Sequence, residues 1–175
     1  MLVRHLGLRP LREVLALKTS LMRRRGAGEV PDILLLAQHP AVYSRGEPLY
    51  HGPGQIAGYP IFHLRERDLT PRAFERSVEA VLIEALRPYE IAAARRRGRS
   101  GLWAGGRRIA EVSVSVRNGI SGLSFVLNVN CDLAALHLVA ARGDPGWTSM
   151  AEILGQPQDE TQVAKAVAEA FLRYF

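Results

Sequence analysis

The chain has a single cysteine, two lysines and no long apolar run. Cys131 is the only cysteine among 175 residues, which excludes an internal disulfide and leaves no cysteine spacing typical of a zinc site. No stretch of eighteen apolar residues offers a membrane-spanning helix, and no signal-peptide pattern opens the sequence. We therefore expect a cytoplasmic protein with no membrane association, no metal and no cofactor.

Lysine is so scarce that the positive charge rests on arginine. Lys18 and Lys165 are the only lysines, yet the formal net charge is +6. A basic surface can attract nucleic acid, but it suits an acidic protein partner equally well. The arginine runs at 23–25 and 95–99 contain no interleaved aromatic residues and no nucleic-acid motif. We interpret them as solvated or partner-facing charge and expect no specific nucleic-acid binding.

Composition and periodicity predict one domain over residues 1–175 with strands interrupted by helices. Hydrophobic residues make up 47% of the chain and charged residues 23%, enough for a sizeable core. Such interruption, with a second half rich in hairpins, favours an α+β mixed sheet packed with helices. We expect strands over 2–8, 32–38, 61–64, 89–94, 101–104, 107–116 and 123–129, and helices from Pro10, Thr70-Pro71, Asp132, Thr148 and Asp159, with turns at Gly105-Gly106 and Asn118-Gly119.

Residues 50–60 combine two glycines, a proline and a histidine between apolar runs. Glycine permits positive φ and close backbone approach, whereas proline fixes φ, so residues 50–60 are predicted to form a rigid, shaped loop. A loop held by a scaffold can carry function, but a tight turn between strands would explain the same residues. His51 is correspondingly a candidate site residue or a side chain that only stabilises the loop.

The string His-Gly-Pro-Gly-Gln at 51–55, followed by Gly-Tyr-Pro at 58–60, resembles the octanoyltransferase (lipoate–protein ligase B) family. The resemblance covers nearly the whole chain and implies the biotin/lipoate protein-ligase fold, a class II synthetase-like mixed sheet with helices against it. Further segments match the family pattern in order: Arg45-Gly46, Gly101-Leu102-Trp103, Gly106-Arg107, Ile109-Ala110, Leu127-Asn128, Asp132-Leu133 and Thr148-Ser149.

The resemblance implies acyl transfer by covalent catalysis in lipoate metabolism. In that reaction a cysteine takes octanoyl from acyl carrier protein as a thioester, and the acyl group then passes to a lysine of a lipoyl domain. A thiolate is a strong nucleophile, and a nearby ammonium lowers its pKa. Acyl carrier protein or a lipoyl domain would accordingly be the partner, with a small acyl or anionic ligand in the site.

The two residues that this chemistry needs are replaced here. Matching the family pattern places Arg108 at the lysine position and Arg142 at the cysteine position. Arginine does not lose its proton in proteins, so neither residue can shuttle a proton or act as a nucleophile. Cys131 lies about ten residues before the expected position by that matching, and we expect it to be a buried core residue away from His51. By the same matching, Ser113 occupies the glycine position where the family leaves room for the acyl chain, and the charged Glu111 lies two residues earlier.

Two hypotheses remain. The first is an acyltransferase with a rearranged site, in which His51 would act with Ser44, Ser113 or Ser149. The second is a non-catalytic scaffold that binds a carrier domain, a small carboxylate or a phosphate. Both predict one concave site containing His51, Arg45, Arg108 and Arg142, with Glu111 on the opposite strand face from Arg108 unless a bulge intervenes. The candidate substrate-binding residues are Arg45, Gly46, Tyr50, His51, Gly52, Pro53, Gly54, Gln55, Arg108, Ile109, Ala110, Asn128 and Arg142.

Overall fold

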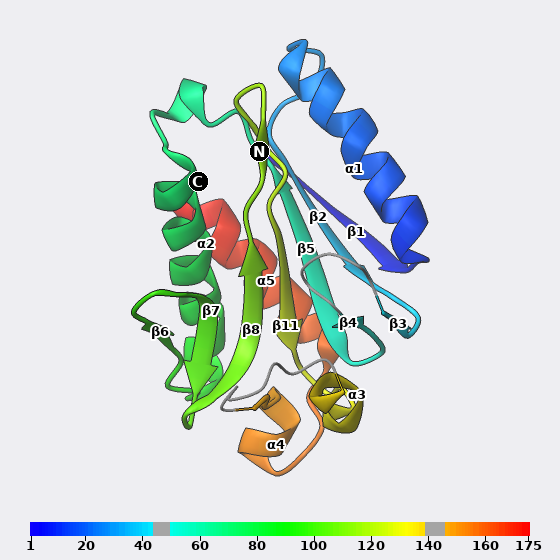
Figure 1. Cartoon of the computed structure of the whole chain (residues 1–175), viewed down its shortest axis with the longest axis vertical. Coiled ribbons are helices and arrows are strands. Elements are labelled where there is room, and N and C mark those ends of the chain that lie inside the picture. Colours follow the sequence, from blue (N-terminus) through cyan, green and yellow to red (C-terminus); the bar gives the residue numbers. More distant parts are fainter. Residues whose placement is uncertain (44–49, 139–145) are drawn as a thin grey trace.

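A seven-stranded mixed sheet organises the protein (Figure 1). The computed structural model describes residues 1–43, 50–138 and 146–175. In spatial order the strands are β1 (Leu2–Leu8), β2 (Ile33–Gln38), β5 (Gln55–Ile61), β11 (Ser124–Asn128), β8 (Arg107–Ser113), β7 (Arg99–Ala104) and β6 (Ala94–Arg96). Only β1 and β2 pair in parallel, and the other neighbours are antiparallel. This architecture confirms the α+β prediction.

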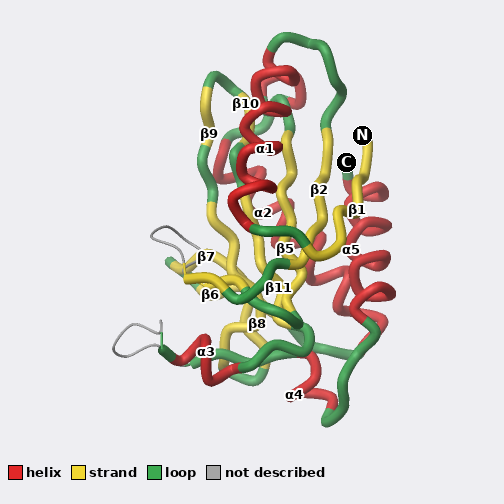
Figure 2. The backbone as a smooth tube through the Cα atoms, turned by 90° about the vertical axis from the view of Figure 1, so that its right-hand side faces the viewer, coloured by secondary structure: helices red, strands yellow, loops and turns green. Residues whose placement is uncertain are grey.

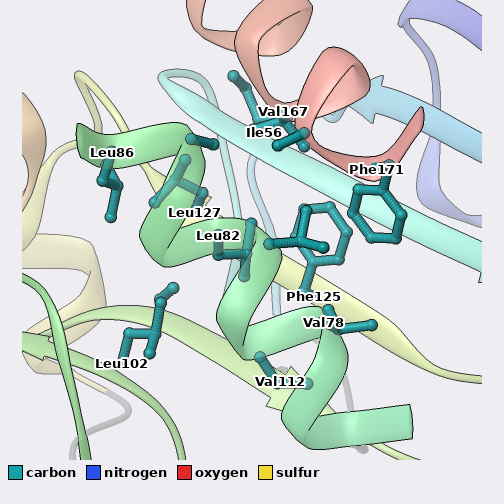
Figure 3. Close-up of a cluster of buried hydrophobic side chains, with 14 of the residues drawn as sticks. Ile56, Val78, Leu82, Leu86, Leu102, Val112, Phe125, Leu127, Val167 and Phe171 are labelled. Atoms are coloured by element: carbon teal, nitrogen blue, oxygen red, sulfur yellow. The ribbon is translucent and has the colours of Figure 1, made fainter. Parts of the chain in front are cut away.

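Three long helices cover the sheet on its two faces (Figure 1). Helices α2 (Pro71–Leu86) and α5 (Glu160–Tyr174) pack on one face, whereas α1 (Leu11–Gly26) lies on the other over β1, β2 and β5. Figure 3 shows the larger core, where Phe125 and Leu127 of the sheet meet Leu82 of α2 and Phe171 of α5. The shorter elements are β3 (Val42–Tyr43), β4 (Tyr50–His51), β9 (Val116–Arg117), β10 (Ile120–Ser121), α3 (Leu133–His137), α4 (Met150–Leu154) and 3₁₀ turns at Arg65–Arg67 and Arg87–Tyr89.

Local sequence chemistry explains where most elements begin and end. The Thr70 hydroxyl accepts a hydrogen bond from the Ala73 N–H at the start of α2, and the Asp159 carboxylate caps α5 in the same way. The β7–β8 hairpin turns through Gly105-Gly106, where both residues have positive φ, 56° and 84°. A two-residue turn of this hand needs such angles, which glycine adopts without strain.

The segment 50–60 is mostly strand, so its prediction as a loop is wrong. β4 and β5 account for most of it, and only residues 52–54 connect them. The glycine within β5 is explained by packing, because a Cβ at Gly58 would lie 1.9 Å from the Phe125 ring. Glycine inside a strand can mark such a close approach rather than a break.

Other boundaries differ from the prediction. No strand spans 89–94, because Tyr89 closes a 3₁₀ turn and β6 begins only at Ala94. The predicted strand 107–116 ends at Ser113, and the predicted 61–64 strand ends at Ile61 as part of β5. Ser149, not Thr148, caps α4, through a hydrogen bond from the Glu152 N–H to the Ser149 hydroxyl. Among the described helices, none has the length and apolar character that crossing a membrane requires.

A candidate acyl-ligand site at one end of the sheet

A chain of buried amides ties the residue 52–54 turn to the neighbouring strands. Gln55 Oε1 accepts from the Gly52 N–H (2.8 Å), and Gln55 Nε2 donates to Asn128 Oδ1 (2.9 Å). Asn128 Nδ2 in turn donates to the Thr148 carbonyl (3.0 Å), and the Thr148 N–H donates to the carbonyl of Arg108 (2.9 Å). The side-chain amides of Gln55 and Asn128 both find hydrogen-bond partners inside the protein, as buried polar groups require. This series of hydrogen bonds therefore fixes the turn beside His51 relative to β11 and β8.

Close approach explains both glycines of the turn, and the contact is with backbone at Gly54 and with a side chain at Gly52. Gly54 has φ 79°, and a Cβ there would lie 2.5 Å from the backbone nitrogen of Cys131. Its carbonyl accepts hydrogen bonds from the N–H groups of Val129 and Asn130. A Cβ at Gly52 would lie 2.1 Å from the Tyr50 hydroxyl oxygen. The two glycines and Pro53 therefore form a fixed turn, consistent with the rigidity that the sequence predicts.

His51 is a buried, neutral imidazole. Its side chain is only 4% exposed, and burial, with a smaller effect of His39, lowers its pKa to about 4. The ring meets that of His39 edge to face at 5.1 Å between centroids. Within the described parts of the chain, His51 Nδ1 has no hydrogen-bond partner. A buried nitrogen of this kind is costly to leave unsatisfied, which marks His51 as a candidate contact for a ligand.

His39 is held by two hydrogen bonds that fix its tautomer. Nδ1 lies 2.7 Å from the Arg9 carbonyl, which can only accept, so Nδ1 carries the proton. Nε2 therefore accepts from the Tyr59 hydroxyl at 2.7 Å. Burial lowers the pKa of His39 as well, so the two facing imidazoles are both neutral near pH 7. This pairing was not predicted, because no sequence spacing links His39 to His51.

Arg108 lies between two indole rings. Its guanidinium carbon is 5.2 Å from the Trp103 ring centroid and 4.9 Å from that of Trp147. Trp103 faces Arg108 across β7 and β8, and Trp147 joins β8 through a parallel bridge at Arg108. Cation–π contacts to both rings hold the charged group in a defined orientation. The role of Trp147 was missed, since it follows a Gly/Pro-rich segment with no periodic pattern.

A bulge in β8 places Arg108 and Glu111 on the same face. Leu102 pairs with Ala110 and Trp103 pairs with Arg108, so Ile109 is the extra residue. Ile109 and Ala110 are both buried in the larger core, which resets the alternation of side chains. The sequence predicts Glu111 on the opposite strand face from Arg108 unless a bulge intervenes. The bulge is present, so the Glu111 carboxylate shares the strand face of Arg108.

Cys131 is buried as expected. It is 7% exposed, and burial raises the pKa of its thiol to about 12. Cys131 packs in a small cluster with Tyr50, Leu136 and Trp147, and its separation from His51 stays a prediction. The thiol is protonated at neutral pH.

The remaining predicted residues fall into three groups. Arg45, Gly46 and Arg142, together with Ser44, lie outside the described residues. Ile109 and Ala110 contribute their side chains to the core. Of the candidate serines, Ser113 is half-buried on β8, whereas the buried Ser149 hydroxyl caps α4. No cluster of three metal-ligating side chains occurs within residues 1–43, 50–138 and 146–175.

The sheet topology and helix placement are those of the lipoate- and biotin-protein ligases. The chain superimposes on a crystal structure of lipoate-protein ligase A bound with ATP with a TM-score of 0.76 at 14% identity, covering 99% of this chain and 85% of that one. Biotin protein ligase from Aquifex aeolicus gives 0.65 at 14% identity, over 99% and 68% of the two chains. A chain from the structural analysis of an archaeal lipoylation system, a bi-partite lipoate protein ligase and its E2 lipoyl domain from Thermoplasma acidophilum, gives 0.72 at 13% identity, over 99% and 82% of the two chains.

Sequence similarity identifies the family within this fold. The lipoyl protein ligase A/B catalytic domain matches residues 43–172. An octanoyltransferase of Alkaliphilus metalliredigens is 33% identical, over 89% of this chain and 86% of its own length. That of Geobacter metallireducens is 31% identical, over 98% and 92%. The chain belongs to the lipoyl protein ligase A/B family, and its curated relatives include octanoyltransferases.

Proposed function

We propose that this protein is an octanoyltransferase-family member of lipoate metabolism that binds an acyl-type or anionic ligand without the covalent thioester step. The observation that carries the proposal is the state of its one thiol. Cys131 is buried with a pKa near 12, so the fraction of thiolate at pH 7 is on the order of 10⁻⁵. A thiol in this state is a poor nucleophile toward an acyl thioester.

The second requirement of the thioester reaction is a lysine, and Arg108 stands at that position. A guanidinium does not titrate in proteins, so it can attract an anion but cannot relay a proton. Its planar fork matches a carboxylate or phosphate in a bidentate arrangement. With Arg108 held between Trp103 and Trp147, the end of the sheet near His51 is suited to anion binding rather than to nucleophilic attack.

The relatives support the kind of molecule that would bind. The family resemblance implies an octanoyl group carried by acyl carrier protein, and a lipoyl domain as its acceptor. The archaeal ligase whose fold this chain shares occurs with an E2 lipoyl domain. We assign one of these carrier domains as the partner, with the acyl or carboxylate end directed toward His51 and Arg108.

The proposal is tested by incubating the protein with octanoyl acyl carrier protein and measuring intact mass. We expect no octanoyl adduct that hydroxylamine removes. The matched control is the Arg108→Lys/Arg142→Cys double variant, which restores both residue types at the family positions and should acquire the adduct. A hydroxylamine-sensitive adduct on the unaltered chain would overturn the proposal.

A rearranged but active transferase is the second candidate, favoured by the similarity to octanoyltransferases over most of the chain. It predicts that a lipoyl domain gains the mass of one octanoyl group when it is mixed with this protein and octanoyl acyl carrier protein. Our proposal predicts no gain above a reaction lacking this protein. The same mixture therefore decides between the two candidates.

A further inference from the structure

A cleft separate from the His51 end opens between α1 and the β9–β10 hairpin, which lie beside one another in Figure 2. Its volume is about 790 Å³, within the range of small-molecule sites. The hairpin is anchored just beyond the last residue of β5: Ile120 bridges His63, and the Leu64 N–H donates to the Gly119 carbonyl. Gln55 is the first residue of β5, and the turn beside His51 precedes it. The seven residues of β5, about 20 Å of strand, therefore separate the His51 site from the hairpin and its cleft.

The charged residues of this cleft are all cationic. Lys18, Arg23 and Arg117 line it, and none of the described residues that line it is acidic. Lys18 is half-buried, and its ammonium donates to the Gly122 carbonyl (2.6 Å) and lies 5.5 Å from the Tyr59 ring centroid. Burial lowers the pKa of Lys18 to about 8. The ammonium group is partly removed from water, and no carboxylate of the described residues offsets this loss of hydration. An anion in the cleft would compensate that loss.

The walls beside these cations are apolar. Leu15 and Met22 of α1 face Val116 and Ile120 of the hairpin across the cleft. Leu15 and Val116 are 41% and 38% exposed, so part of this apolar surface is open to water. Gly122 leaves no room for a side chain, because a Cβ there would lie 2.4 Å from the Ser115 hydroxyl oxygen and 3.3 Å from the Met22 methyl carbon. No aromatic residue lines the cleft among those described, which disfavours stacking of a base or other flat ring.

We propose that this cleft binds an amphiphilic anion, an alkyl chain ending in a carboxylate or phosphate. The head group contacts Lys18, Arg23 and Arg117, and the chain lies against Met22, Val116 and Ile120. The inference does not rest on the proposed function at the His51 end, because it uses none of the same residues.

The scarcity of lysine provides a site-specific test. Reductive ¹³C-dimethylation labels only Lys18, Lys165 and the chain's amino terminus, so the Lys18 signal can be followed alone by NMR. We expect octanoate and octyl phosphate to shift the Lys18 signal in a saturable way and to raise its pKa by about one unit, because a nearby anion favours the ammonium. Octanol and inorganic phosphate should produce less than a tenth of the shift, and exposed Lys165 should not respond.

Variants separate this cleft from other cationic places on the protein. Arg23→Gln/Arg117→Gln should weaken octanoate binding, read at Lys18, at least tenfold. The matched control Arg72→Gln/Arg97→Gln removes two arginines elsewhere and should leave binding within twofold. Arg108→Gln should also leave it within twofold. Calorimetry on unlabelled protein, including Lys18→Met, checks that the methyl groups do not create the site.

Several results would overturn the inference. They are an unresponsive Lys18 signal, an equal response to inorganic phosphate, or equal weakening by the Arg72/Arg97 control. Loss of binding in Arg108→Gln alone would place octanoate at the family site and reject the cleft while leaving the proposed function standing. A stronger response to octyl phosphate than to octanoate, or the reverse, identifies which head group the cleft prefers.

Discussion

His51 illustrates how burial rather than a partner sets the chemistry of one residue. The imidazole is neutral well below pH 6, which makes it a hydrogen-bonding group for an acyl oxygen or carboxylic acid and not a cation. It faces His39, whose pKa is also lowered by burial. Protonation of one ring would disfavour protonation of the other, because the two positive charges would repel each other. Because Nδ1 has no hydrogen-bond partner among the described residues, it is the atom of His51 best placed to contact a ligand.

This environment makes stability depend on pH. An unfolded histidine binds its proton near pH 6.5, whereas folded His51 does so only near pH 4, so folding stability is lost as pH falls from about 6.5 to 4. For His51 alone the full loss is roughly 3 kcal/mol. We expect urea denaturation at pH 7.5 and 4.5 to show most of this loss, and His51→Leu to reduce the slope of stability against pH.

The exposed His5 supplies the control for that measurement. His5→Leu removes one histidine from the surface and controls for the substitution itself, and His39 will keep part of the slope in His51→Leu because its own pKa is lowered. An identical pH dependence in His51→Leu and the unaltered protein would contradict the assignment of a buried, neutral His51.

At the scale of elements, β5 shows where sequence interpretation succeeds and fails. Caps and turns are local, so Thr70, Asp159 and the Gly105-Gly106 hairpin were predictable from their immediate neighbours. β5 was misread because its Gly and Pro residues suggest a loop, whereas burial between β2 and β11 makes it a strand. The partner that explains Gly58 is Phe125, more than sixty residues away. Such long-range packing leaves no local signal.

Replacing Gly58 tests that packing directly. Gly58→Ala would place a methyl group within the Phe125 ring in a core that cannot expand easily, and overpacking of this kind costs about 1–3 kcal/mol, occasionally more. Chemical denaturation should show a loss in this range. Gly26→Ala at the end of α1 is the control, since its Cβ meets only ordinary contact at 3.6 Å from Ile120 and alanine favours helix. Equal stability of both variants would contradict the close approach.

The candidate site at the scale of the whole molecule was only partly predictable. The motif at 51–55 can be read directly from the sequence, whereas the placement of Arg108 and Arg142 at the family's lysine and cysteine positions stays a prediction. The amide chain through Gln55, Asn128 and Thr148 depends on β5 and β11 being adjacent, and the stacking of Trp147 on Arg108 depends on a bridge to β8. Strand order and register determine both features, and one sequence alone does not specify them.

A buried acid joins distant parts of the chain. Asp32, just before β2, accepts hydrogen bonds from Arg25 of α1 (2.7 Å) and Arg67 (2.6 Å), and Arg67 also donates to the carbonyl of Phe175 (3.0 Å). Arg25 is only 8% exposed and also pairs with Glu66, which corrects its interpretation as solvated charge. Burial alone would raise the pKa of Asp32, but the two guanidinium groups and the His63 N–H lower it.

Asp32→Asn removes the charge that both arginines share and leaves buried Arg25 only partly compensated. Breaking a buried pair in this way costs about 3–5 kcal/mol, here reduced because Glu66 still pairs with Arg25 and Arg67 is partly exposed. We therefore expect a loss of roughly 2–3 kcal/mol in urea denaturation at pH 7. Because the pKa of folded Asp32 is lowered, the stability that Asp32 contributes is present above about pH 4 and disappears as the pH falls through the folded pKa. The difference in stability between Asp32→Asn and the unaltered protein should therefore shrink in acid.

Glu29→Gln, which breaks the exposed pair with Arg24, is the control and should cost less than about 1 kcal/mol at any pH. A loss for Asp32→Asn no larger than that for Glu29→Gln would show that Asp32 does not hold α1, β2 and the last residue of the chain together.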